Sequence, residues 1–212
     1  MKTKPIIFNT EMVNALLDGR KTVTRRPPKK EVTYSEHGGF CCDGYMLGLG
    51  FSPDSTMNNF VKSKHAPCQV GDLLYVRETF CIGKIDECDA EHPADRHLFV
   101  SQCKGDKNHI PKQWLLDERI SIEDVVFKPS IHMPRTASRI TLKVTDVRIE
   151  KLNDLRKNEE QIKKEGFKNW PSFKHVWESI YGQSNPNDYV WVIEFDVINQ
   201  NIDDYIKSLP SK

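Results

Sequence analysis

The chain has 212 residues, a formal net charge of +1, 38% hydrophobic residues and 29% charged residues. These values are typical of a soluble globular protein, and the length is sufficient for one domain with a sizeable hydrophobic core. No apolar run approaches the roughly 18 residues that a membrane-spanning helix needs, and residues 1–8 lack the apolar segment of an export signal, so we expect a cytoplasmic protein without a membrane partner.

The first two predicted elements are an edge strand and a helix. Residues 5–8 are apolar and begin with a proline, which suits a strand at the edge of a sheet. The helix follows, with Asn9 or Thr10 as its N-cap and Gly19 as its end. Its apolar face has helical spacing and consists of Met12, Val13, Leu16 and Leu17.

A basic stretch, defined here as residues 19–30, comes after this helix. Six of its twelve residues are lysine or arginine, and none is acidic. The β-branched residues Thr22, Val23 and Thr24 favour a strand. Lys21 lies at the turn before this strand, so we expect its side chain to approach the Thr24 hydroxyl. The alternative is a solvated hairpin edge whose charge prevents aggregation.

Two long segments are predicted to be irregular. Residues 27–69 contain repeated proline and glycine turn signals, and residues 81–125 are polar with further scattered prolines and glycine. Between them, a Gly71-Asp72 turn leads into a strand at residues 73–78 that is apolar on both faces for most of its length. We therefore expect two insertions on the surface of the domain.

The cysteines are concentrated in these two segments. All six lie between residues 41 and 103, and none forms a Cys-x-x-Cys pair, the strongest zinc signature. In a chain that is not exported we expect mostly reduced thiols, with no metal and no cofactor. The alternative is a zinc site formed where two segments meet in space, with ligands drawn from His37, Cys41, Cys42, His65 and Cys68.

Residues 128–135 are bounded by prolines, which exclude a helix interior and favour an extended, rigid segment. This segment is expected to bring His132, Arg135 and Arg139 to the start of the next strand. The alternative is a purely structural loop, in which the histidine hydrogen-bonds to backbone groups.

Two long strands are predicted in the last third of the chain. Apolar residues alternate over residues 140–144 and continue in the opposite phase over residues 147–149. The phase slip indicates a bulge or bend, a device by which a strand curves round a small barrel. Residues 189–197 have a continuous apolar and aromatic face, which predicts a strand in the centre of a sheet.

Two helices are predicted between these strands. Asn158 is the expected N-cap of a helix at residues 159–164 that Gly166 ends, and a second helix begins after Asn169. The apolar stripe of the second helix consists of Phe173, Val176, Trp177 and Ile180, which we expect to pack in the core rather than stack on bases. Residues from 199 onward are predicted to form a polar, partly helical tail.

The helix followed by Gly-Arg-Lys-Thr-x-Thr-x-Arg at residues 19–26 resembles the opening signature of the ASCH domain, a relative of the PUA-like RNA-binding barrels. A Gly-Asp turn into a strand recurs in these families, and the Pro-Ser-Ile-His-Met-Pro-Arg run at residues 129–135 is similar to one in larger phage-type and bacterial members. The resemblance covers residues 5–26, 70–78 and 139–197. It implies an α+β fold with a small mixed β-barrel and flanking helices.

The resemblance also implies a domain organisation and a ligand class. We expect one domain over residues 1–200, with insertions at about 27–69 and 81–125 and a C-terminal tail over residues 201–212. The family's ligands are RNA or modified nucleosides, bound in a cleft beside the basic strand. One small bacterial branch hydrolyses the amide of N4-acetylcytidine with a Lys, a Thr and a Glu, which correspond to Lys21, Thr24 and Glu165.

The chemistry of these three residues fits amide hydrolysis. The reaction needs an oxygen nucleophile, a base to take its proton and an acid for the leaving amine. Thr24 supplies the hydroxyl. Lys21 is a base only if its pKa falls, which repulsion from Arg20, Arg25 and Arg26 favours. Glu165 ends its helix, where the helix dipole favours the protonated form and would let it act as the acid; the alternative is a surface helix residue.

Two further functions remain open at this stage. The first is a non-catalytic RNA- or nucleotide-binding module, in which aromatic side chains stack on bases. Its phosphate contacts would come from Arg20, Lys21, Arg25, Arg26, Arg135 and Arg139. The second is a metal-independent ribonuclease that uses His132 together with Lys21, an activity associated with the wider family.

Overall fold

The computed structural model describes residues 1–47, 52–83, 97–99, 122–182 and 185–210. The chain divides into two compact units, which are described separately here. Unit 1 comprises Met1, Gly19–Asp72 and Lys143–Asp196, and unit 2 comprises Lys2–Asp18, Leu73–Leu142 and Val197–Lys212. Both contain helices and strands, so the α+β class is as predicted. In the part of the chain that the structure describes, no strand pairing closes a barrel. Nor does any helix of that part combine the length and the apolar character needed to cross a membrane.

The strands that carry the basic stretch belong to unit 1. Strand β2 (Val23–Arg26) pairs antiparallel with β11 (Tyr189–Ile198), which has β10 (Thr141–Lys151) as its other neighbour. The predicted phase slip in β10 is confirmed, because Leu142 and Val144 are buried before it and Val147 and Ile149 after it. The basic strand is thus paired with β11, most of whose residues are apolar and buried.

Residues 27–69 are not the irregular insertion that their composition predicts. They form a three-stranded antiparallel sheet of β3 (Val32–Ser35), β4 (Gly39–Cys42) and β5 (Tyr45–Leu47), followed by helix α2 (Pro53–Val61). The reason is that the turn signals separate short elements. Gly39 and Gly44 have φ values of +67° and +79° at the two hairpin turns, and Ser52 caps α2.

Helix α2 is fixed to unit 1 by aromatic packing. Phe60 of α2 stacks between Phe40 of β4, with ring centroids 4.8 Å apart, and Trp191 of β11, with centroids 5.1 Å apart. Phe60 is fully buried. Such offset aromatic pairs stabilise a core beyond the area that they bury, so this segment is an integral part of unit 1.

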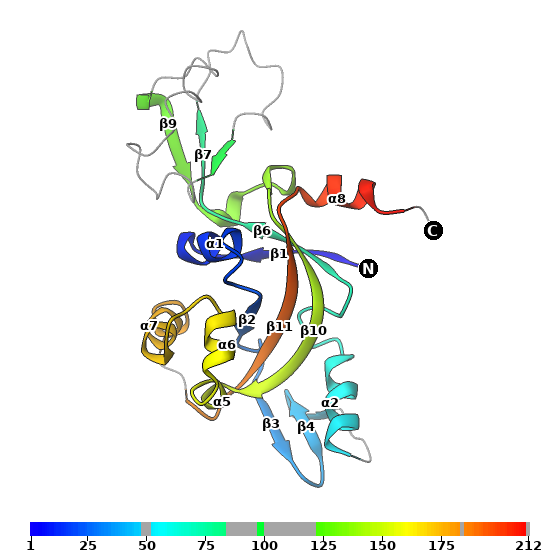
Figure 1. The fold of residues 1–212 in the computed structure, drawn as a ribbon. Coiled ribbons are helices and arrows are strands. Elements are labelled where there is room, and N and C mark those ends of the chain that lie inside the picture. Colours follow the sequence, from blue (N-terminus) through cyan, green and yellow to red (C-terminus); the bar gives the residue numbers. More distant parts are fainter. Residues whose placement is uncertain (48–51, 84–96, 100–121, 183–184, 211–212) are drawn as a thin grey trace. The chain divides into compact units, whose positions relative to one another are not determined.

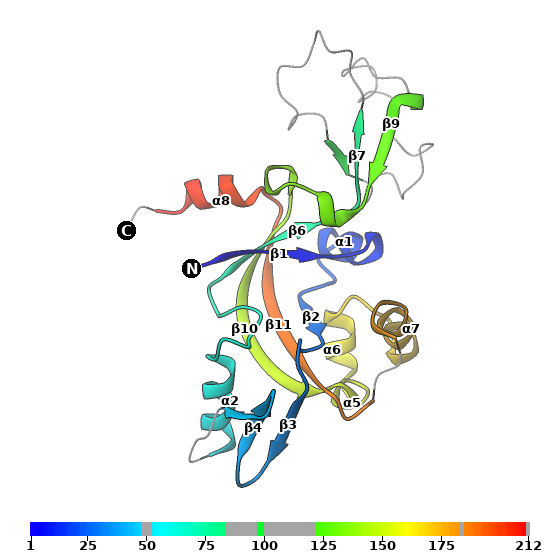
Figure 2. The same ribbon diagram turned by 180° about the vertical axis from the view of Figure 1, so that it is seen from behind.

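Three helices complete unit 1: α5 (Leu152–Leu155), α6 (Glu159–Lys164) and α7 (Trp170–Tyr181). Figures 1 and 2 show α6 beside β2, with α7 on the side of α6 that is away from β2. The predicted N-caps are confirmed, since the side chains of Asn158 and Asn169 accept hydrogen bonds from the first turns of α6 and α7. The predicted stripe of α7 is confirmed at Phe173 and Trp177, which are buried, whereas Ile180 is 45% exposed.

Unit 2 contains the N-terminal strand and helix. Strand β1 (Thr3–Ile7) pairs parallel with β6 (Leu73–Arg77), and Asn9 caps helix α1 (Thr10–Leu17) as predicted. A three-stranded sheet has β7 (Phe80–Gly83) between β8 (His97–Phe99) and β9 (Val125–Lys128). Of the second predicted insertion, residues 84–96 and 100–121 lie outside the described residues.

The proline-bounded segment of unit 2 is not extended as predicted. After the single turn η4 (Ile122–Asp124) and strand β9, it forms two 3-10 turns, η5 (Ser130–His132) and η6 (Arg135–Ala137). Each turn begins directly after a proline in the extended region, Pro129 or Pro134. A proline at that position restricts the residue before it and leaves the following residues free to turn. The predicted helical tail is confirmed as α8 (Ile202–Ser208).

Candidate functional site

The basic stretch is buried at its centre rather than solvated. Lys21 is 0% exposed, Thr24 2% and Arg25 3%. The hairpin-edge interpretation is therefore wrong for these residues. The burial follows from the fold of unit 1, because β2 pairs with β11 along its length and α6 lies beside it (Figure 1). Buried cations need partners.

Lys21 finds its partner in Glu165, as the predicted site requires. The two residues form an isolated antiparallel backbone bridge. The Lys21 ammonium donates to the Glu165 carboxylate Oε2 at 2.7 Å and to the Glu165 carbonyl oxygen at 2.9 Å. Glu165 is the C-cap of α6 and is 2% exposed, and Gly166 ends the helix with a φ of +89°. The structure thus brings together two residues that are 144 positions apart.

Arg25 also contacts Glu165, so this carboxylate lies between two cations. Arg25 Nη1 is 3.1 Å from Glu165 Oε1, and Arg25 Nη2 is 2.9 Å from Glu150 Oε2. Both oxygens of Glu165 therefore accept hydrogen bonds from charged donors. In this arrangement both carboxylate oxygens of Glu165 are acceptors.

The charge cluster extends along β10. Arg148 donates to Asp146, Glu150 and Glu194, and Gln161 of α6 accepts from both Arg148 and Arg25 at 3.4 Å. We define the buried charge cluster as the buried residues Lys21, Arg25 and Glu165 together with the part-buried residues Arg148, Glu150 and Glu194. The sequence analysis did not identify Arg148, Glu150 or Glu194. The sequence does contain a pattern that could have revealed them. Asp146, Arg148 and Glu150 are spaced two residues apart, which places three charged side chains on one face of a strand.

Burial and neighbouring charges shift the pKa values of two members of the cluster. Burial lowers the pKa of Lys21; the carboxylate of Glu165 opposes this shift, and the charges of Arg26 and Arg25 reinforce it. For Glu150, burial favours a higher pKa, but the hydrogen bond from Arg148 and the charge of Arg25 lower the pKa overall. The lowered pKa of Lys21 is the property that a general base near neutral pH needs.

The lowered pKa of Lys21 predicts a stability that increases on the alkaline side. An ordinary lysine titrates near 10.5, so between the native pKa and 10.5 the unfolded chain binds a proton that the native protein does not bind. The free energy of unfolding therefore rises with pH in this window and levels off above 10.5. We expect urea denaturation of the wild type, compared with Lys21→Met, to show this rise. If the free energy of unfolding of the wild type, relative to that of Lys21→Met, stays constant or falls up to pH 10.5, the lowered pKa of Lys21 is contradicted.

Thr24 is buried in β2, opposite Ile193 of β11. Strand alternation places it on the face of β2 opposite to Val23 and Arg25. The flanking arginines of the basic stretch have partners within unit 1. Arg20 donates to the Gly166 carbonyl oxygen at 3.3 Å, and Arg26 donates to the Tyr181 hydroxyl at 2.9 Å.

The remaining predicted site residues belong to unit 2. Arg135 donates to Asp203 of α8 and to the Thr3 hydroxyl. Arg139 contacts both carboxylate oxygens of the buried Glu78, at 2.8 and 3.1 Å. His132 is exposed at the end of η5, where its backbone amide donates to the Pro129 carbonyl oxygen. These contacts fit the alternative interpretation, in which the proline-bounded segment is structural.

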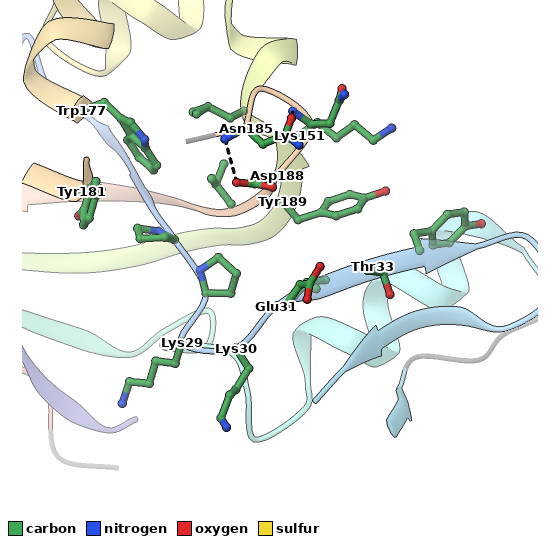
Figure 3. A pocket seen from close by; sticks show the side chains of 17 residues that line it. Lys29, Lys30, Glu31, Thr33, Lys151, Trp177, Tyr181, Asn185, Asp188 and Tyr189 are labelled. Carbon is green, nitrogen blue, oxygen red and sulfur yellow. Dashed lines mark hydrogen bonds between the residues drawn. The ribbon is translucent and has the colours of Figure 1, made fainter. Parts of the chain in front are cut away.

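A cavity of about 740 Å³ lies elsewhere in unit 1. Figure 3 shows its lining, which comes from the segment that follows β2, the end of β10, helix α7 and the start of β11. Neither Lys21, Thr24 nor Glu165 lines it. The lining residues are Pro27, Pro28, Lys29, Lys30, Glu31, Val32, Thr33, Tyr34, Lys151, Leu152, Trp177, Tyr181, Asn185, Asn187, Asp188, Tyr189 and Val190.

The alternative zinc site is not formed in the part of the chain that the structure describes, where no three His, Cys, Asp or Glu side chains are grouped to hold a metal ion. Cys42 Sγ lies 3.6 Å from His65 Nδ1. Burial raises the pKa of the Cys42 thiol, and the neighbouring Asp43 adds to the shift, so this pair is not an activated thiolate.

Comparison with known proteins gives no relative. No protein-family model, curated protein or solved structure matches the chain. A functional assignment therefore rests on the residues and contacts described above.

Proposed function

We propose that this chain is an ASCH-type, PUA-like protein directed at RNA or modified nucleosides, and that unit 1 hydrolyses the amide of N4-acetylcytidine-like substrates. The observation that supports this most is the contact of 2.7 Å between the fully buried Lys21 and Glu165. It joins two of the three residues that the resemblance singles out, and Thr24 lies three positions after Lys21, in β2.

The proposed reaction begins with proton transfer from the Thr24 hydroxyl to the neutral amine of Lys21. The Thr24 oxygen attacks the acetyl carbonyl carbon, the bond from this carbon to N4 of cytidine breaks, and N4 takes the proton from Lys21. Water then hydrolyses the acetyl-threonine ester and releases acetate. The overall balance is N4-acetylcytidine plus water to cytidine, acetate and a proton.

Glu165 is a positioning residue in this scheme. It accepts from Lys21 with one oxygen and from Arg25 with the other. The first contact fixes the amine and stabilises the ammonium that forms when Lys21 takes the proton. Lys21 itself then returns the proton to the leaving amine, which replaces the acid role that the sequence analysis gave to Glu165.

The proposal requires a local opening of unit 1. Lys21, Thr24 and Glu165 are each at most 2% exposed, so the acetyl group reaches Thr24 only when the side chains above it move. Buried, water-excluding surroundings favour the chemistry once the substrate is inside. They also make opening a candidate for the slow step.

The test is release of acetate from N4-acetylcytidine by the purified protein, in the presence of a chelator. We expect stoichiometric formation of cytidine and acetate. A protein that folds as described but releases no acetate, from either the free nucleoside or a short acetylated RNA, overturns the proposal.

No specific observation favours the two other functions at the basic strand. The Arg25 guanidinium pairs with two carboxylates, so it is not displayed to a phosphate.

A further inference from the structure

We propose that the 740 Å³ cavity of unit 1 is a nucleotide-binding site, separate from the Lys21–Thr24–Glu165 site. Its volume lies within the range of about 300–1,000 Å³ that is typical of small-molecule sites. Eight consecutive lining residues, Pro27–Tyr34, come from the segment outside the ASCH resemblance. The other nine come from residues 151–190, within the resemblance. Because neither Lys21, Thr24 nor Glu165 lines the cavity, the site goes beyond the function proposed above.

Aromatic side chains form two parts of the cavity wall. The partly exposed Tyr181 of α7 packs against the buried Trp177, with ring centroids 4.6 Å apart, so Tyr181 is the member of this pair that offers a surface for stacking. Tyr34 of β3 and Tyr189 of β11 both contact the ring of the buried Phe40, with centroids 5.0 and 5.6 Å away. Rings held in this way lose little freedom when a ligand binds. Flat aromatic surfaces accept any nucleobase by stacking.

Polar groups lie between the aromatic parts. The side chains of Asn185, Asn187 and Asp188 supply amide and carboxylate groups, and the Asp188 carboxylate is fixed by the backbone amide of Asn185 at 3.1 Å (Figure 3). Glu31 adds a second carboxylate. Carboxylates repel a phosphate but accept hydrogen bonds from the amino groups of a base, so the base, and not the phosphate, belongs inside.

The cations lie at the rim. Lys29, Lys30 and Lys151 are exposed, and Figure 3 shows Lys29 and Lys30 extending away from Trp177 and Tyr181. Lys30 has an exposed partner, Asp43, at 3.3 Å. Exposed ammonium groups of this kind contact phosphates and make binding salt-dependent. A ligand that places a base between the aromatic rings and a phosphate near the lysines at the rim is a nucleotide.

The bound nucleotide is either a free mononucleotide or one nucleotide of a single-stranded RNA. The probes are cytidine 5′-monophosphate and a fluorescently labelled five-nucleotide RNA of mixed sequence, each titrated at low and at high salt. We expect binding of at least one probe that weakens with salt. Affinity for the RNA alone identifies a single strand as the ligand, and equal affinity for both identifies a mononucleotide.

Two variants test the cavity itself. Lys29→Ala/Lys151→Ala removes two rim charges and is expected to weaken binding about tenfold, while Lys62→Ala/Lys64→Ala, which removes two exposed lysines of unit 1 outside the cavity, leaves it unchanged. Tyr34→Ala removes a ring that is 39% exposed and is expected to weaken binding by a similar factor. All three variants are expected to keep the wild-type release of acetate from the free nucleoside.

The outcome is independent of the proposed hydrolysis. If no acetate is released but the probes bind and the cavity variants lose affinity, the nucleotide site stands and the hydrolase fails. If neither probe binds the wild type, or if the cavity variants bind as tightly as the lysine control, the nucleotide site is overturned even when acetate is released.

Discussion

Thr24→Val is expected to reduce kcat/KM for acetate release from N4-acetylcytidine by about a thousandfold or more. Valine has nearly the shape of threonine but lacks the hydroxyl that attacks the acetyl carbon, and removal of a catalytic nucleophile typically costs this much or more. Thr24 is 2% exposed within β2, so a β-branched replacement keeps the strand and its packing. The measurement is initial rates of acetate formation, with the wild type and the variant at equal concentration.

Thr22→Val is the matched control for this experiment. Thr22 lies two residues before Thr24, just outside β2, and its backbone groups hydrogen-bond to Lys164 and Phe195; a valine leaves these bonds intact. Its activity should stay within a few-fold of wild type, and Thr24→Ser should retain measurable activity because the hydroxyl remains. Full activity in Thr24→Val would show that Thr24 is not the nucleophile, independently of the role of Lys21.

Local features of the fold were predictable from the sequence. Asn158, Asn169 and Gly166 have residue-specific roles at helix ends, since an asparagine side chain satisfies free amides and glycine adopts positive φ without a steric cost. The phase slip in β10 was also readable, because burial on one face of a strand has a period of two residues. Each of these signals depends only on near neighbours in the chain.

Short elements and long-range contacts were not predictable in the same way. Strands of three or four residues, such as β3 and β5, contain too few positions to display an alternation, so their glycine-rich turns dominated residues 27–69. The partner of Lys21 came from the family resemblance and not from spacing. The contact of Arg25 with Glu150 depends on which strands are neighbours in unit 1, and the sequence does not encode that locally.

The buried charge cluster leads to the second large effect: Glu165→Gln is expected to lower the free energy of unfolding by about 3–5 kcal/mol. The substitution keeps the size of the side chain but leaves the ammonium of Lys21, which is 0% exposed, and the guanidinium of Arg25 without their shared anion. Urea denaturation measures the loss. Glu160→Gln on the same helix is the control, because Glu160 is 76% exposed and pairs with Lys164 at the surface, where such pairs contribute at most about 1 kcal/mol.

A double-variant cycle separates the two cations. If the loss in Glu165→Gln arises from uncompensated buried charge, replacing Lys21 by methionine in the same chain should recover a large part of it, because the apolar side chain needs no anion. Arg25 retains Glu150 at 2.9 Å as its second partner, so the recovery should depend mainly on Lys21. If the double variant is less stable than Glu165→Gln alone, Lys21 stabilises unit 1 through its long side chain rather than through its charge, and the loss in Glu165→Gln does not arise from an uncompensated ammonium.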